Sequence, residues 1–225
     1  LLWHQSVLQF IAAASQLGVG VREVPIETGP FLTVARNKIL DKMLQHEDEY
    51  LLMTDTDIVF RPEHVSLLLE ADAAIAGAHY LTAATGEPPR ASALVLREAA
   101  GEDAEGNAVD PTYEPVSLPE LPDPPDPEEF LGEDDGPAWQ AAVEMYRAEL
   151  AEPEYAPRKV AAVGCGLMLI KREVCVAMAE KYDHPFEYIG STGEDVIFCL
   201  RAATLGFDTM LVPQAFVGHI KSVVL

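Results

Sequence analysis

The sequence predicts an α/β domain in which a mostly parallel sheet is sandwiched between helices. The chain has 225 residues, 49% of them hydrophobic, which is enough to bury one sizeable core. Residues 50–54 form a continuous apolar run, as is typical of a strand that is buried on both faces. Strands and amphipathic helices then alternate along the chain, and this order favours parallel strands joined by helical crossovers.

Apolar residues at helical spacing predict the helices, and short apolar runs between turn residues predict the strands. Pro62 stands at a helix start, where its missing N–H is not needed. The helices are expected at residues 4–17, 32–45, 62–71, 171–182 and 194–205. Besides 50–54, strands are expected at residues 21–26, 73–80, 91–96, 160–163, 167–170 and 207–212, the last of them ended by Pro213.

Residues 97–157 are predicted to be an acidic insertion within a single domain that spans residues 1–225. They carry 18 acidic and 2 basic residues, a formal charge of −16 out of −22, and 10 of the 17 prolines. Such a composition cannot fill a core and favours a loop or a partly disordered segment. Helical spacing of apolar residues predicts one helix inside it, over 138–150. A lid, a substrate-site element, a partner surface and a solvated loop with one packed helix all fit this pattern.

Charge and cysteine content exclude several classes of protein. A net charge of −22 repels phosphate backbones, so general nucleic-acid binding is not expected. No apolar run reaches the ~18 residues of a membrane span, and no secretory signal is visible, so a cytoplasmic protein without a membrane span is expected. Cys165, Cys175 and Cys199 are odd in number and form no CxxC pair, so neither a disulfide framework nor a zinc site is expected. We expect them to be small buried hydrophobic residues.

The strongest chemical signal is the pair of carboxylates, Asp55 and Asp57, that directly follows the apolar strand. Open α/β sheets place their ligand sites at the C-terminal ends of strands. Mg²⁺ and Mn²⁺ prefer hard oxygen ligands and can bridge the charges of a nucleotide diphosphate. One aspartate would hold the metal while the other reaches the ribose or a metal-bound water. The alternative is that both are turn residues that cap the next helix.

Several motifs in this order resemble those of the GT-A glycosyltransferases, and most of all family 2 enzymes and their bacterial and phage relatives. They are ARNK at 35–38, DTD at 55–57, RPEHV at 61–65, AGAHY at 76–80, VGCGLMLIKR at 163–172, GEDVIFCLRA at 193–202 and GH at 218–219. The resemblance covers most of the chain except residues 97–157. It implies a GT-A (Rossmann-like) fold that lacks the usual first strand, which holds the nucleobase. Because a QxxRW motif and membrane helices are not found, transfer of single sugars is expected rather than polymer synthesis.

The resemblance implies a metal-dependent glycosyltransferase that moves a sugar from a UDP- or GDP-sugar to an acceptor hydroxyl, with inversion the expected outcome. Asp57 and His219 would bind Mn²⁺ or Mg²⁺, and Asp55 would contact the metal shell or the ribose. Asp195 would be the general base, and Glu194 would orient the acceptor or the helix. Further contacts near the donor would come from Arg36, Asn37, Gly164 and Gly166.

Each of these residues also has a structural interpretation. Glu194 and Asp195 would favour the dipole of a helix N-terminus and cap the helix, and the two glycines would mark a bulge or turn. Arg36 would be a surface residue, Asn37 would make an internal polar contact, and His219 would be a structural histidine with its hydrogen bonds satisfied. Two other functions stay open: a nucleotidyltransferase that makes sugar nucleotides, although its glycine-rich basic loop is not seen, and a non-catalytic GT-A-like binding module. The acceptor also stays open: it could be a glycan, a lipid-linked sugar, a protein or a modified nucleobase, of which the acidic charge disfavours the last.

Overall fold

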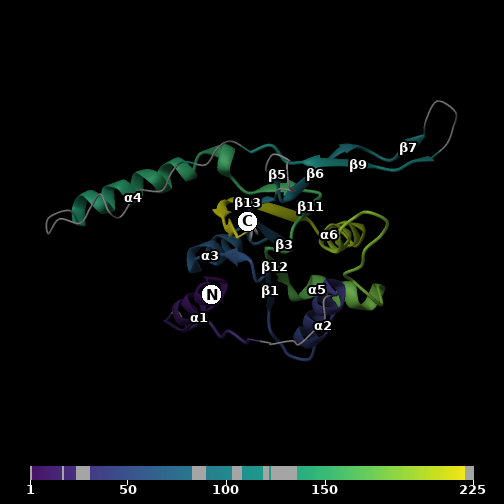
Figure 1. Cartoon of the computed structure of the whole chain (residues 1–225), viewed down its shortest axis with the longest axis horizontal. Coiled ribbons are helices and arrows are strands. Elements are labelled where there is room, and N and C mark those ends of the chain that lie inside the picture. Colours follow the sequence, from purple (N-terminus) through teal and green to yellow (C-terminus); the bar gives the residue numbers. More distant parts are fainter. Residues whose placement is uncertain are drawn as a thin grey trace, which may run out of the picture.

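The computed structural model describes residues 2–16, 18–23, 31–82, 90–102, 108–118, 122 and 136–220. At its centre lies a five-stranded sheet with the strand order β1-β12-β3-β13-β10 (Figure 1). These strands are β1 (Tyr50–Thr54), β12 (Leu167–Lys171), β3 (Ile75–His79), β13 (Thr209–Phe216) and β10 (Arg158–Val160).

The sheet is mixed, so the prediction of a mostly parallel sheet was wrong. Only β3 and β13 are parallel neighbours, whereas β1–β12, β12–β3 and β13–β10 are antiparallel pairs. β1, β3 and β13 nevertheless run in the same direction, because β12 lies between β1 and β3 and is antiparallel to both. Helix–strand alternation predicts the direction of strands that are joined by helices. It does not apply to β12, which follows β11 (Ala162–Val163) after a short turn.

One edge of this sheet collects the ends of three strands. Thr54, the last residue of β1, is paired with Leu167, the first residue of β12. The amide of Asp55 donates a hydrogen bond to the carbonyl of Gly166, at 3.1 Å. The C-terminal end of β3 reaches the same edge, since it also pairs with β12. The segment with the two aspartates and the segment with the two glycines are therefore adjacent.

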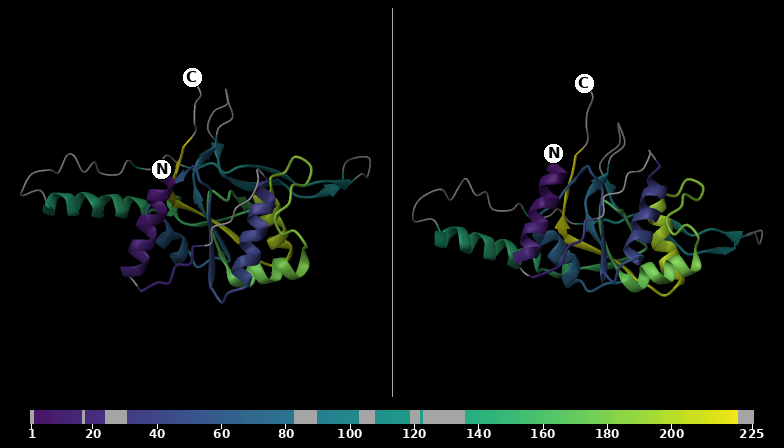
Figure 2. Two further views of the ribbon diagram at one scale, coloured as in Figure 1. Left: turned by 60° about the horizontal axis from the view of Figure 1, so that its bottom comes forward. Right: turned by 90° about the horizontal axis from the view of Figure 1, so that it is seen from below.

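Helices cover both faces of the sheet, as predicted (Figure 2). α1 (Leu2–Gln16) and α3 (Pro62–Glu70) lie on one face, and α2 (Leu32–Leu44), α5 (Arg172–Lys181) and α6 (Glu194–Thr204) lie on the other. β12 supplies both cores by alternation: Met168 and Ile170 pack in one, Leu167 and Leu169 in the other. This follows from the two-residue period of a strand. Within the described part of the chain, no helix is long and apolar enough to cross a membrane.

Part of the acidic segment forms strands that its composition did not predict. β9 (Thr112–Pro115) pairs with β6 (Ala93–Glu98), the strand that was expected at 91–96 and that also pairs with β11, and β7 (Gly101–Glu102) pairs with β8 (Ala108–Val109). α4 (Gly136–Leu150), followed by a short 3₁₀ helix at Pro153–Tyr155, confirms the helix expected there. In Figure 1 the β7–β9 arm and α4 project from the body in opposite directions.

The remaining predicted elements are confirmed within a few residues, with three exceptions. The strand expected at 160–163 is divided between β10, in the central sheet, and β11, which pairs with β6. β13 does not end at Pro213 but continues to Phe216, and its pairing register shifts between Val212 and Phe216, where the proline has no N–H to donate. Residues 21–23 do not form the predicted strand, and 24–26 lie outside the described residues. All three cysteines are buried and free, as expected. Two short pairings were missed, β2 (Ile58–Val59) with β14 (Gly218–His219) and β4 (Leu81–Thr82) with β5 (Arg90–Ala91).

Candidate functional site

The pairing of β2 with β14 brings Asp57 and His219 together at the edge of the sheet. His219 lies opposite Ile58, and the amide of Ile220 donates to the carbonyl of Asp57 at 2.8 Å. As a result, Nε2 of His219 is 3.1 Å from Oδ2 of Asp57. The other ring nitrogen, Nδ1, is 3.1 Å from the carbonyl oxygen of Leu81. Asp57 and His219 are thus direct neighbours, whereas Asp55, which was also predicted at the metal, binds Arg36 instead.

The hydrogen bonding of His219 fits a bound cation. A carbonyl oxygen only accepts hydrogen bonds, so Nδ1 must carry a proton when it bonds to Leu81. In the neutral ring Nε2 then directs a lone pair at the carboxylate of Asp57, which also only accepts. Two acceptors 3.1 Å apart require either a proton shared between them or a metal cation. Metal-binding histidines commonly have their other N–H fixed by a backbone carbonyl in this way.

A metal ion bound by Asp57 and His219 would be accessible to further ligands. The side chain of Asp57 is 51% exposed, so a cation held there would remain accessible to a substrate. Across the described residues, no group of three or more His, Cys, Asp or Glu side chains is placed to hold a metal. One nitrogen and one carboxylate oxygen would leave most coordination positions of a Mg²⁺ or Mn²⁺ ion to other ligands.

Arg36 links Asp55 to Glu194. Its guanidinium, only 4% exposed, donates from Nη2 to Oδ1 of Asp55 at 3.0 Å and from Nη1 to Oε1 of Glu194. Glu194 is itself buried at the first position of α6. Burial alone would lower the pKa of Arg36, but Cys165 and the surrounding carboxyl groups raise it overall, so the guanidinium is a permanent cation. The planar fork of an arginine suits such a bridge, which ties the DTD segment to the start of α6.

Asp195 lies half-buried beside this bridge. Its Oδ2 accepts a hydrogen bond from the amide of Cys165 at 3.3 Å, and its Oδ1 accepts one from the amide of Val196 at 2.8 Å. Burial raises the pKa of Asp195 above its ordinary value, although Arg36 acts in the opposite direction. A carboxylate with a raised pKa binds a proton more strongly, which is the property that a general base needs. Burial also raises the pKa of Asp55, against the lowering effect of Arg36.

Gly164 and Gly166 allow the close approach of Tyr80. A Cβ atom added to Gly164 would lie 2.1 Å from Oη of Tyr80, and one added to Gly166 would lie 2.6 Å from its ring. The amide of Gly166 donates to Oη of Tyr80 at 3.1 Å. The ring of Tyr80 in turn meets the ring of His219 edge-on, with 5.5 Å between centroids. The sequence analysis did not select Tyr80 as a site residue, although its place directly after β3, at the ligand-binding edge, was a usable signal.

We expect replacement of Gly164 with alanine to destabilise the domain by about 1–3 kcal/mol, because the new methyl group overlaps the hydroxyl of Tyr80. Gly101→Ala is the matched control, since nothing lies within 4 Å of its added Cβ. Adding Tyr80→Phe should recover part of the loss by removing the overlapping oxygen. Urea unfolding followed by circular dichroism measures all of these. Equal stability of the Gly164→Ala and Gly101→Ala variants would show that Tyr80 is not held as described.

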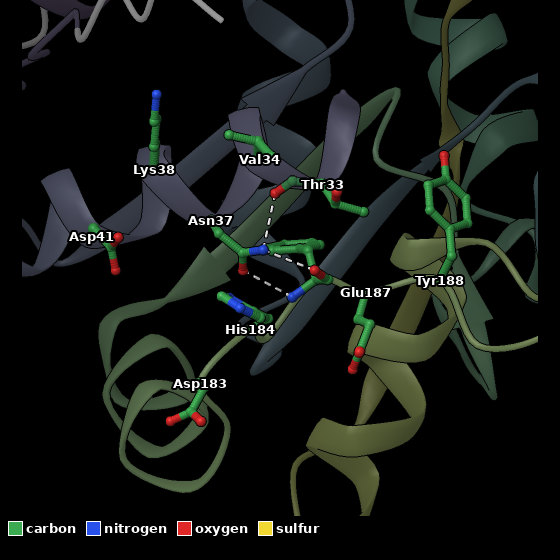
Figure 3. A pocket seen from close by; sticks show the side chains of 10 residues that line it. Thr33, Val34, Asn37, Lys38, Asp41, Asp183, His184, Glu187 and Tyr188 are labelled. Carbon is green, nitrogen blue, oxygen red and sulfur yellow. Dashed lines mark hydrogen bonds between the residues drawn. The ribbon is translucent and has the colours of Figure 1, made fainter. Parts of the chain in front are cut away.

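Asn37 occupies a different position from its neighbour Arg36. Its Nδ2 donates to the carbonyls of Thr33 at 2.9 Å and Phe186 at 2.8 Å, and its Oδ1 accepts from the amide of Phe186 at 3.0 Å (Figure 3). The side chain therefore fastens the loop before α6 to α2. This is the internal polar role that was the alternative to a donor contact, and the donor contact of Asn37 stays a prediction.

Neither a protein-family model nor the sequence of a curated protein matches the chain. Among solved structures, A197 from STIV is similar, with a TM-score of 0.50 at 15% identity, over 96% of this chain and 79% of that chain. GalNAc-T7, solved with UDP, GalNAc and Mn²⁺, is similar with a TM-score of 0.50 at 16% identity, over 94% of this chain and 34% of that chain. The chain thus spans about a third of the length of GalNAc-T7. These likenesses, together with the mixed sheet between two helical layers, show a GT-A-like α/β fold.

Proposed function

We propose that the chain is a metal-dependent glycosyltransferase domain that moves a sugar from a nucleotide-sugar donor to an acceptor hydroxyl with inversion. The observation that carries this proposal is the Asp57–His219 pair, whose hydrogen bonding fits a cation. It is supported by the sheet edge that holds the pair, where the Arg36 bridge and Asp195 also lie. It is further supported by the GT-A-like fold, because GalNAc-T7 was solved with UDP, GalNAc and Mn²⁺.

Each residue has a stated part in this proposal. Asp57 and His219 would hold Mn²⁺ or Mg²⁺, and that ion, when bound, neutralises the charge that develops on the departing diphosphate. Asp195 would accept the proton of the acceptor hydroxyl. Asp55 and Glu194 would fix Arg36 between them, and Arg36 would hold the DTD segment against the start of α6; its contact with the phosphates of a UDP- or GDP-sugar stays a prediction. Gly164 and Gly166 would allow Tyr80 to pack closely beside His219.

The first test is thermal unfolding of the full chain with UDP, GDP, CDP or dTDP, each with and without Mn²⁺. A ligand that binds only the folded state stabilises it, by about 2.7 kcal/mol at a hundred times its Kd. We expect one nucleotide to raise the melting temperature in a Mn²⁺-dependent manner in the wild type and to lose this effect in Asp57→Ala. The control is Asp208→Ala, which removes an exposed carboxylate that pairs with Lys159 on the surface.

The outcomes separate the parts of the proposal. Stabilisation that is equal with and without Mn²⁺, or unchanged in Asp57→Ala, would contradict the metal site. If no nucleotide stabilises the full chain, the donor site itself is contradicted, and a non-catalytic binding module becomes the better interpretation. Release of the nucleotide from the matching nucleotide-sugar then measures turnover directly.

A further inference from the structure

A cleft of about 440 Å³ lies between α2 and the loop that precedes α6 (Figure 3). None of the groups discussed for the metal or for the general base lines it. Its volume falls within the range of small-molecule binding sites in proteins, roughly 300–1,000 Å³. Thr33, Val34 and Lys38 contribute to its wall on α2, and His184, Glu187 and Tyr188 to its wall on the loop.

Both ends of the loop wall are fixed, so the cleft is formed before any ligand binds. At one end, Asn37 of α2 makes hydrogen bonds with both the amide and the carbonyl of Phe186. From the other side, Arg201 of α6 donates to the carbonyl of His184 at 2.6 Å and forms an ion pair with Glu187 at 2.5 Å. The guanidinium of Arg201 also lies 4.6 Å from the ring centroid of Tyr182. A preformed wall lowers the entropy that a ligand loses on binding.

Tyr188 connects this cleft with the candidate catalytic groups. Its side chain is close enough to Glu194 for Glu194 to be the main cause that raises the pKa of Tyr188, and Asp195 raises this pKa as well. Glu194 is the direct neighbour of Asp195 and is bound to Arg36. A molecule that lies along the cleft with one end at Tyr188 therefore reaches the general base proposed here.

The chemistry of the lining suits uncharged sugar rings. The side chain of Tyr188 is 56% exposed, so its ring offers an apolar face to the cleft and a polar tip beside Glu194. Asp41 and Asp183 are exposed carboxylates of the lining that make no ion pair within the described part of the chain. Carboxylates accept hydrogen bonds from sugar hydroxyls, but they repel phosphate and carboxylate groups. Arg201 neutralises Glu187, and in Figure 3 the ammonium of Lys38 points away from both free carboxylates.

We infer that this cleft binds the acceptor and that the acceptor is an uncharged carbohydrate chain. The sugar next to the reacting hydroxyl packs on Tyr188, and the preceding sugars lie along α2 toward Asp41 and Asp183. The inference rests on the proposed transferase function and narrows its acceptor. It disfavours lipid-linked sugars, whose phosphates would face the two carboxylates, and it disfavours nucleic acid for the same reason.

The test applies the full chain to a printed panel of neutral and acidic glycans, and the strongest binder is then titrated by calorimetry. We expect the wild type to bind neutral glycans. Tyr188→Ala should weaken that binding about ten-fold or more, equivalent to about 1.4 kcal/mol. Ile189→Ala, which removes the exposed side chain of the next residue, is the matched control and should bind as the wild type does. Asp41→Asn combined with Asp183→Asn should weaken the binding of neutral glycans and allow acidic glycans to bind.

Three results would overturn the inference: stronger binding of acidic glycans by the wild type, equal binding by the Tyr188→Ala and Ile189→Ala variants, or no binding to any glycan of the panel. The nucleotide experiment on the same samples separates this failure from failure of the proposed function. If Mn²⁺-dependent stabilisation by a nucleotide persists while no glycan binds, the acceptor inference alone is wrong. If glycans bind through Tyr188 while no nucleotide stabilises the chain, the cleft holds carbohydrate and the transferase proposal is wrong.

Discussion

Replacing Arg36 with methionine is expected to lower the free energy of unfolding by about 3–5 kcal/mol, the usual cost of removing one partner of a buried ion pair. Arg36 is 4% exposed, and its partner Glu194 is 5% exposed. Methionine fills a similar volume but leaves the carboxylate of Glu194 buried without its cation. Asp55 suffers less, because its side chain is 36% exposed and water can replace the lost hydrogen bonds. The destabilisation should therefore come mainly from Glu194.

A second substitution tests that assignment. Adding Glu194→Gln to Arg36→Met removes the unpaired charge, so the double variant should be more stable than Arg36→Met alone. Arg22→Met is the surface control, since the Arg22–Asp48 pair is largely exposed and such pairs contribute about 0–1 kcal/mol. Urea unfolding gives the three values. If Arg36→Met and Arg22→Met lower the stability equally, Arg36 does not hold the two segments together as described.

The individual helices and strands of this fold were predictable from the sequence, whereas the relative directions of the strands in the central sheet were not. β1 and the helices follow from apolar patterns within a single segment. The place of β12 between β1 and β3 depends on which strands pair, and pairing joins residues that are far apart in the sequence. The same limit explains the strands of the acidic segment. β6 and β9 pair with each other, but residues such as Glu98 and Glu114 are exposed, so their composition resembles that of a loop.

In the candidate site, too, the residues could be predicted from sequence motifs, but the contacts between them could not. Asp57 and His219 were predicted from their motifs, but their separation of 3.1 Å depends on the pairing of β2 with β14, which no local pattern indicates. Arg36 and Asn37 were predicted as one pair of donor contacts. Successive residues on a helix point about 100° apart, so one side chain reaches Glu194 while the other reaches the loop at Phe186. Tyr80 was missed because its role depends on the space that two distant glycines leave for it.

Asp195→Asn is expected to reduce sugar transfer by about 10²–10⁴-fold, the usual contribution of general acid–base catalysis. Asparagine has nearly the same shape, but its single oxygen can accept from the amide of Cys165 or of Val196, not from both, and it cannot take a proton. Binding of the nucleotide with Mn²⁺ should be retained, because Asp57 and His219 are intact. Nucleotide release from the nucleotide-sugar measures the rate. Asp195→Glu is the companion variant, since it keeps the carboxylate but moves it by one methylene.

The pH dependence gives a second measure of the same residue. The base acts when it is ionised, so the wild-type rate should fall as the pH drops through the pKa of Asp195. Burial raises that pKa, so this fall should occur at a higher pH than the value of about 3.9 for an ordinary aspartate. The fall should be missing from the residual rate of Asp195→Asn. An unchanged pH profile in that variant would assign the acid limb to another group and contradict the role of Asp195.

Stability should change in the opposite direction from activity. Because the pKa of Asp195 is higher in the folded chain than in the unfolded one, proton binding favours folding, and this contribution is lost as the pH rises through the folded pKa. At neutral pH the ionised side chain therefore works against folding, and a neutral asparagine does not. We expect Asp195→Asn to melt close to the wild-type temperature while it loses turnover, because removal of the charge offsets the one amide hydrogen bond that asparagine cannot accept. Loss of activity without loss of stability is typical of a catalytic group that is held in an unfavourable environment. If the carboxylate only capped α6, its replacement would instead destabilise the protein and leave turnover unchanged.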